Sequence, residues 1–92
     1  MRKKKRELWQ VLDEDRRLRR WPARNELRLA ALGYLASKFD ADQKYSEAAV
    51  NALLRRWHAF DDPALLRREL YDRGFIGRTR DGRAYWKAAA AP

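Results

Sequence analysis

Apolar residues recur at helical spacing in several stretches of the chain. The widest apolar stripe lies in residues 23–39, which we predict to form a helix that is covered on more than one side. Its apolar positions include Leu27, Leu29, Ala31, Leu32, Leu35, Ala36 and Phe39. A tighter stripe in residues 47–58 predicts a second helix, with Ser46 as its N-cap. Lys44 and Tyr45 precede that helix as a short extended segment.

The clearest helix start in the chain follows, because Asp62 can cap a helix and Pro63 suits its first position. We predict that this helix ends at about Arg73, since Gly74 favours the left-handed conformation found after helix C-termini. Three leucines of this helix point to one side. Its outward face consists of Ala64, Arg67, Arg68 and Tyr71.

The last element is predicted to be a β-hairpin with strands in residues 75–80 and 83–87. The Asp-Gly pair at residues 81–82 indicates a two-residue type I′ turn, in which both positions have positive φ. Trp86 can then lie over Gly77, which has no side chain. The register of this turn pairs Arg80 with Arg83, Thr79 with Ala84, Arg78 with Tyr85 and Gly77 with Trp86.

The first segment has a weaker helical pattern, and Trp21 before Pro22 breaks it. Two acid–base pairs at i, i+4 spacing can brace such a helix; they are Asp13–Arg17 and Asp15–Arg19. We therefore divide the chain into a basic N-terminal arm or helix (residues 1–21), a main domain (residues 22–87) and a flexible tail (residues 88–92).

The order of elements is helix, short strand, helix, helix, hairpin. This order predicts an α+β, mainly α fold: a winged-helix-like three-helix domain with a C-terminal β-hairpin, preceded by an N-terminal basic helix. In a winged helix, the helix before the hairpin usually enters the major groove of DNA, and the hairpin tip touches the backbone or minor groove. Because fold alone does not establish function, function has to be inferred from the residues themselves.

The net charge is large for a chain of 92 residues, since 22 Lys and Arg face 13 Asp and Glu, giving +9. Residues 1–20 carry a net charge of +5, residues 21–54 are neutral, and residues 55–92 carry +4. Such an excess attracts polyanions, nucleic acid first and then an acidic protein or an anionic membrane. Solubility alone is the plain alternative.

Residues that carry catalytic chemistry are few. The chain has no cysteine, and its single histidine, His58, is more in keeping with a packed or surface residue than with a metal ligand. No glycine-rich phosphate loop occurs. We therefore expect no enzymatic activity, cofactor or metal, and no small-molecule substrate is evident. No apolar run can span a membrane or follow the basic start as a signal peptide, so we expect a cytoplasmic location and no membrane partner.

Six side chains are the candidate nucleic-acid contacts: Arg67, Arg68, Tyr71, Arg78, Arg80 and Arg83. Arginine can fork onto guanine or phosphate, and tyrosine can stack or donate to phosphate. A type I′ turn sets Arg80 opposite Arg83, a repulsion that an anionic partner would relieve. The alternative is a solvated charged face diluted by Glu69 and Asp72. The basic tracts at residues 2–6 and 16–20 are equally open to a phosphate-binding or a solubilising role.

Four short motifs lie between Arg17 and Trp86. They are residues 17–22, Tyr45-Ser46-Glu47 with Val50-Asn51, residues 66–70, and Gly74 with Arg78, Asp81-Gly82 and Tyr85-Trp86. In these motifs the chain resembles an uncharacterised bacterial family, a domain of unknown function found alone or attached to helix-turn-helix regulators of the arsenical-resistance-repressor type. The resemblance implies a winged-helix-like domain in a transcription-related setting, with no assigned activity. It also singles out Asn51, as a partner of the neighbouring loop, and Glu69, as a partner of Arg73 or of a hairpin arginine.

The sequence therefore predicts a nucleic-acid-binding module that acts on duplex DNA in transcriptional regulation. Two alternatives stay open. One is a protein-interaction module whose N-terminal helix supplies Trp9, and the other is an RNA- or ribosome-binding accessory protein. Charge alone does not distinguish among these partners.

Overall fold

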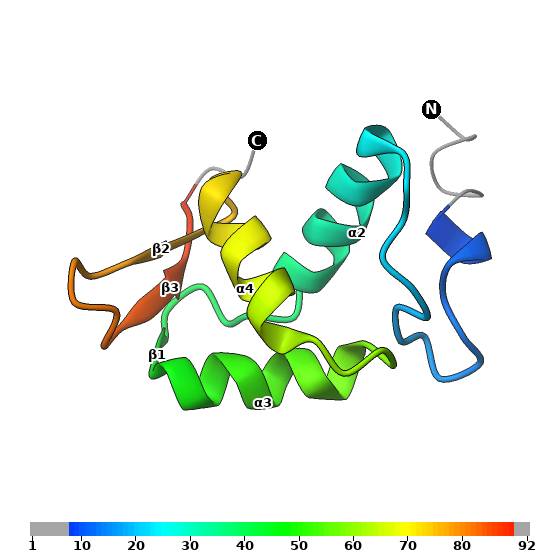
Figure 1. The fold of residues 1–92 in the computed structure, drawn as a ribbon. Helices are drawn as coiled ribbons and strands as arrows, with labels where there is room; N and C mark the ends of the chain where they lie inside the picture. Colours follow the sequence, from blue (N-terminus) through cyan, green and yellow to red (C-terminus); the bar gives the residue numbers. More distant parts are fainter. Residues whose placement is uncertain (1–7, 90–92) are drawn as a thin grey trace.

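The computed structural model describes residues 8–89 of the chain (Figure 1). The basic tract at residues 2–6 and the last three residues of the predicted tail lie outside the described part. Residues 8–10 are helical, and the elements that follow are α2 (Asn25–Ala36), β1 (Lys44–Tyr45), α3 (Glu47–Trp57), α4 (Pro63–Asp72), β2 (Ile76–Arg78) and β3 (Tyr85–Lys87). The predicted α+β, mainly α class is confirmed.

The predicted helix boundaries of α3 and α4 are set by their caps. The Ser46 side chain accepts a hydrogen bond from the Ala49 amide at 3.0 Å, and the Asp62 side chain accepts one from the Leu65 amide at 3.2 Å. Gly74 follows α4 with a φ of 82°, the left-handed conformation that its lack of a side chain permits. The three cap predictions are therefore confirmed.

The sheet is antiparallel, with strand order β1-β3-β2. Gly77 pairs with Trp86 and Arg78 pairs with Tyr85, as the sequence predicts. A β-carbon on Gly77 would lie 2.5 Å from Nε1 of Trp86, so only glycine fits under this indole ring. The packing of Trp86 over Gly77 therefore fixes the register together with the backbone hydrogen bonds.

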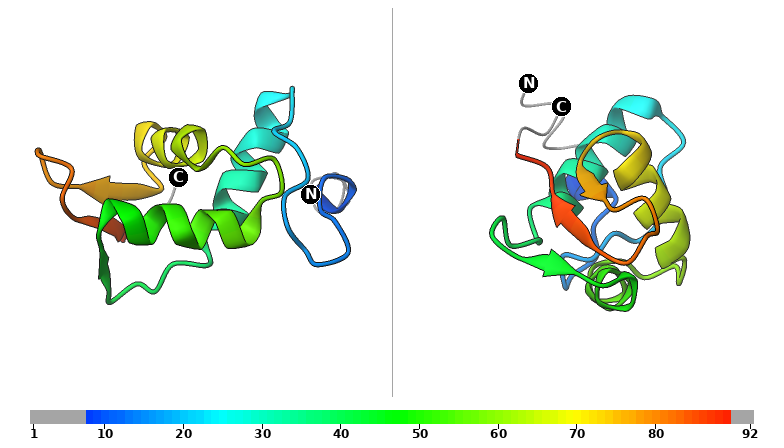
Figure 2. Two further views of the ribbon diagram at one scale, coloured as in Figure 1. Left: turned by 60° about the horizontal axis from the view of Figure 1, so that its bottom comes forward. Right: turned by 90° about the vertical axis from the view of Figure 1, so that its left-hand side faces the viewer.

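The core lies where the three helices meet, and α4 contacts both α2 and α3. Its fully buried leucine and valine side chains include Leu32, Leu35, Val50, Leu54, Leu66 and Leu70. The hairpin of β2 and β3 projects from one end of this bundle, and residues 11–20 lie at the other end (Figures 1 and 2). In the part of the chain that the structure describes, every helix is too short or too polar to cross a membrane.

Residues 11–20 do not form the helix that the acid–base spacing predicts. Instead they make a turn, in which the Asp13 carboxylate accepts hydrogen bonds from the amides of Asp15 (2.9 Å) and Arg17 (2.8 Å). Leu18 forms β-bridges with Leu12 and with His58. An i, i+4 ion pair contributes only about 0.3–0.5 kcal/mol to helix stability. The hydrogen bonds from backbone amides to Asp13 and the burial of Leu18 therefore favour the turn over the helix.

This N-terminal segment completes the end of α3. The Arg17 side chain donates hydrogen bonds to the carbonyls of Arg55 (3.2 Å) and His58 (2.5 Å), which satisfies carbonyl groups at the helix C-terminus. Tyr34 donates from its hydroxyl to the Arg16 carbonyl at 2.6 Å, and burial raises the pKa of Tyr34. The described part of residues 1–21 is therefore packed as part of the domain rather than as a free arm.

His58 is a packed histidine. Its side chain is almost completely buried, with Nδ1 against the Leu54 carbonyl and Nε2 accepting a hydrogen bond from the Asp62 amide at 2.8 Å. Both ring nitrogens therefore serve the junction between α3 and α4. Among residues 8–89, no group of three His, Asp or Glu side chains is placed to hold a metal ion.

Candidate nucleic-acid interface

The predicted outward face of α4 is confirmed by burial. Leu66 and Leu70 are fully buried, whereas Arg68 is exposed and Tyr71 is 40% exposed. Arg67 lies between these two faces and is partly buried. Helical spacing alone produces this arrangement, since residues three and four positions apart share a face.

The α4 side chains form one wall of a shallow pocket of about 410 Å³. We call it the arginine pocket, and its lining residues are Glu47, Arg67, Arg68, Tyr71, Asp72, Arg78 and Tyr85. They come from the first turn of α3, from α4 and from both hairpin strands. Four of the six predicted contact residues thus lie on one surface: Arg67, Arg68, Tyr71 and Arg78.

Two arginines of the pocket are held by neutral groups. Arg67 donates from Nη1 to the Asn51 side-chain carbonyl at 2.5 Å, while its Nη2 lies 3.9 Å from the nearest Glu47 carboxylate oxygen. Asn51 therefore holds α4 and not the neighbouring loop, which corrects the partner implied by the family resemblance. The Arg78 guanidinium stacks over the Tyr71 ring, 4.6 Å from its centroid, and so joins β2 to α4.

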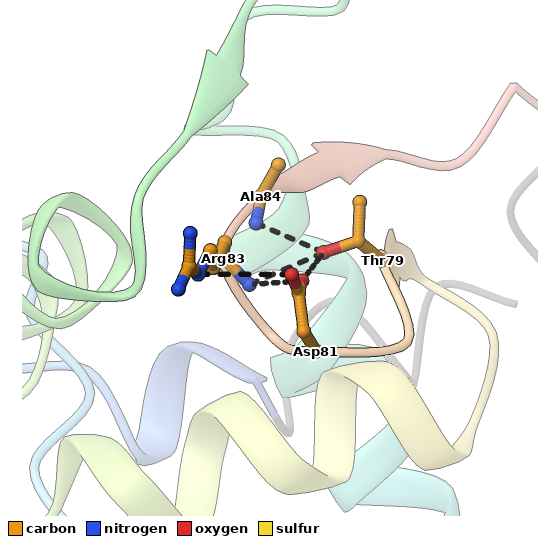
Figure 3. A network of polar contacts seen from close by, with 4 residues as sticks. All are labelled: Thr79, Asp81, Arg83 and Ala84. Atoms are coloured by element: carbon orange, nitrogen blue, oxygen red, sulfur yellow. Dashed lines mark hydrogen bonds and ion pairs between the residues drawn. The ribbon is translucent and has the colours of Figure 1, made fainter.

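The hairpin tip differs from the predicted type I′ turn. Asp81 does not have a positive φ, and residues 80–83 form a longer loop closed by a hydrogen bond from the Thr79 amide to the Ala84 carbonyl at 2.9 Å. Figure 3 shows the reason: the Thr79 hydroxyl accepts from the amides of Arg83 (3.1 Å) and Ala84 (3.2 Å). It also donates to the Asp81 carboxylate at 2.7 Å.

In this loop the backbone does not set Arg80 directly opposite Arg83, so the repulsion expected between them does not arise. Arg80 and Arg83 are not a cross-strand pair, both are exposed, and neither lines the arginine pocket. Arg83 lies 3.7 Å from the Asp81 carboxylate. The Thr79 hydroxyl and the backbone amide of Arg83 lower the pKa of Asp81, so its negative charge stays beside Arg83. Arg80 and Arg83 are therefore outlying candidates.

Comparison with protein families matches residues 17–87 of the chain to the family described as "Uncharacterized protein conserved in bacteria (DUF2087)". The chain belongs to the DUF2087 family. The matched range contains all six predicted contact residues and every lining residue of the arginine pocket. No curated protein matches the chain. No solved structure matches it either.

Arg73, the residue that caps the C-terminus of α4, is bound internally. Arg73 pairs with Glu69 at 3.0 Å and donates to the Asn25 side chain at 2.6 Å. Of the two partners considered for Glu69, the structure selects Arg73. Arg73 and Glu69 therefore fasten α4 to α2 and lie outside the arginine pocket.

Glu47 and Tyr85 line the pocket although neither is among the six predicted contact residues. Tyr85 could have been found from the predicted register, because it is the cross-strand partner of Arg78. Glu47 entered the predictions only as the first residue of a helix and as part of one motif of the family resemblance. Its place beside Arg67 depends on how α3 crosses α4, which periodicity does not reveal.

Proposed function

We propose that this DUF2087 protein is a non-catalytic winged-helix module that binds nucleic acid, with duplex DNA as its ligand, in transcriptional regulation. The observation that carries this proposal is the clustering of three guanidinium groups and a tyrosine on one surface, made by α4 and the hairpin. These residues are Arg67, Arg68, Arg78 and Tyr71.

The topology supports this proposal by analogy. The order α2-β1-α3-α4-β2-β3, with the sheet order β1-β3-β2, corresponds to the arrangement of winged-helix domains. In that arrangement α4 is the recognition helix and the β2–β3 hairpin is the wing. An α-helix with its side chains is about 10–12 Å across and fits the B-DNA major groove, which is about 12 Å wide.

Arg68 is the side chain that we expect to contact DNA. Within residues 8–89 its side chain makes no hydrogen bond or ion pair, and it is exposed on the outward face of α4. Such a guanidinium can bind a phosphate or the O6 and N7 atoms of guanine without first breaking an internal contact. Arg67, in contrast, is oriented in advance by Asn51.

The test is a salt titration of binding to a short fluorescent duplex, followed by anisotropy. We expect log affinity of the wild type to fall linearly with log salt concentration, by about 0.9 for each phosphate contacted. Arg68→Ala should weaken binding and reduce this slope by about one phosphate contact. Arg20→Ala is the matched control, because Arg20 is also exposed but lies outside the arginine pocket.

Equal losses in the two variants would reject the assignment of the surface, and salt-independent binding would reject the proposed function itself. Structured RNA added as a competitor distinguishes the remaining polyanions. Displacement of the duplex by RNA at lower concentration than by unlabelled duplex would favour the RNA- or ribosome-binding alternative.

A second candidate function rests on the opposite end of the molecule. Trp9 is 56% exposed, and the Arg16 guanidinium lies 5.3 Å from the centroid of its ring. A mainly apolar depression of about 150 Å³ adjoins it, lined also by Leu8, Leu12 and Tyr34. This surface favours protein interaction; a stable oligomer in light scattering that Trp9→Ala abolishes, without DNA binding, would support it.

A further inference from the structure

The Glu47 carboxylate contacts the arginine pocket on two sides: Arg67 of α4 and Tyr85 of the hairpin. Glu47 is the first residue of α3, and one carboxylate oxygen lies 3.9 Å from Nη2 of Arg67 and 3.4 Å from the Tyr85 hydroxyl. Both distances exceed those of strong charge-assisted hydrogen bonds, which are about 2.7–2.9 Å. The Glu47 side chain is 52% exposed, so water can replace either contact.

The pocket has more positive charge than its own acids neutralise. Its lining has three arginines against Glu47 and Asp72. Arg67 is held by an amide and Arg78 by an aromatic ring, so neither loses its charge to a close carboxylate. Guanidinium groups that line one pocket can bind a phosphate group, which accepts paired hydrogen bonds from arginine.

We propose that the arginine pocket is a subsite for one phosphate of the nucleic-acid backbone, and that the Glu47 carboxylate is an internal competitor that the phosphate displaces. This inference rests on the proposed function and adds to it the group that is bound. Displacement costs little because the two contacts of Glu47 are long. The repulsion between carboxylate and phosphate lowers the affinity for any backbone, and so raises the share of binding that depends on other contacts.

Glu47 also has a purely structural role that must be separated from this one. An acid in the first turn of a helix is stabilised by the helix dipole, and Glu47 occupies such a position in α3. If that were its whole role, removing its charge would lower stability slightly and leave ligand affinity unchanged. The two roles therefore predict different affinities for one substitution: unchanged if Glu47 acts only on the helix, and tighter if it competes with the phosphate.

The experiment compares Glu47→Gln with wild type in duplex binding at low salt, with unfolding temperatures recorded for each protein. We expect Glu47→Gln to bind roughly tenfold more tightly, the factor that corresponds to about 1.4 kcal/mol. Glu14→Gln is the matched control, because Glu14 is also exposed and lies outside the pocket. It removes the same charge, and screening should limit its gain to about twofold.

A second arm uses inorganic phosphate alone and follows the arginine side-chain signals by NMR. We expect shifts at Arg67, Arg68 and Arg78 that saturate at lower phosphate concentration in Glu47→Gln. Equal duplex affinities for Glu47→Gln and Glu14→Gln would overturn the competitor and leave DNA binding standing. Phosphate shifts without duplex binding would overturn the proposed function and leave the subsite standing. Absence of both would overturn both.

Discussion

Arg67 and Arg68 are neighbours in the sequence, yet the structure gives them different surroundings. Helical periodicity predicts both on the outward face of α4, and the structure places Arg68 there but Arg67 at the edge of that face, partly buried. That Asn51 holds Arg67 at 2.5 Å while Arg68 stays exposed depends on the packing of α3 against α4. The way in which α3 packs against α4 cannot be predicted from a single sequence.

His58 gives the clearest prediction about stability at the level of one residue. His58→Ala removes the hydrogen bond to the Asp62 amide and leaves a cavity at the α3–α4 junction. We expect the free energy of unfolding in urea to fall by about 2–4 kcal/mol. Gln43→Ala, at an exposed loop position, should stay within about 0.5 kcal/mol of wild type. A similar small change in both variants would show that His58 is not a structural residue.

The hairpin shows which features of an element can be predicted from local sequence. Its register was correct because the Asp-Gly pair and the empty space over Gly77 agree on one alignment. The turn type was wrong because the Thr79 side chain binds the amides of the loop and favours a longer connection. Turn rules describe the two central residues and omit a hydroxyl just outside them.

The hairpin loop also predicts a pH response. Because the pKa of Asp81 is lowered, chiefly by the Thr79 hydroxyl, the loop is stabilised by the ionised carboxylate above the ordinary aspartate pKa. That stabilisation is lost as the pH falls through the lowered pKa, below about pH 4. We expect Thr79→Val to return the pKa of Asp81 towards its ordinary value, as measured by carbon NMR titration of the carboxyl group.

Thr79→Ser is the matched control for that titration, since serine keeps the hydroxyl. It should preserve the lowered pKa of Asp81. If Asp81 titrates at the same pH in Thr79→Val and in wild type, the hydrogen bond from Thr79 in Figure 3 does not lower the pKa of Asp81.

For the molecule as a whole, the sequence showed two basic ends of the chain around a neutral middle. In the described part of the chain, the hairpin and residues 11–20 lie at opposite ends of the helical bundle (Figure 1). Only the hairpin end combines arginines with the outward face of α4. The N-terminal arginines include Arg17, which completes the end of α3 and is not available as a mobile arm.

NMR mapping of duplex binding on isotope-labelled protein at low salt shows directly whether the arginine pocket contacts DNA. We predict that the signals that shift belong to the arginine pocket and α4, above all Arg67, Arg68, Tyr71 and Arg78, while those of residues 11–20 stay in place. Shifts concentrated in residues 11–20 and around Trp9, with the pocket unchanged, would contradict it.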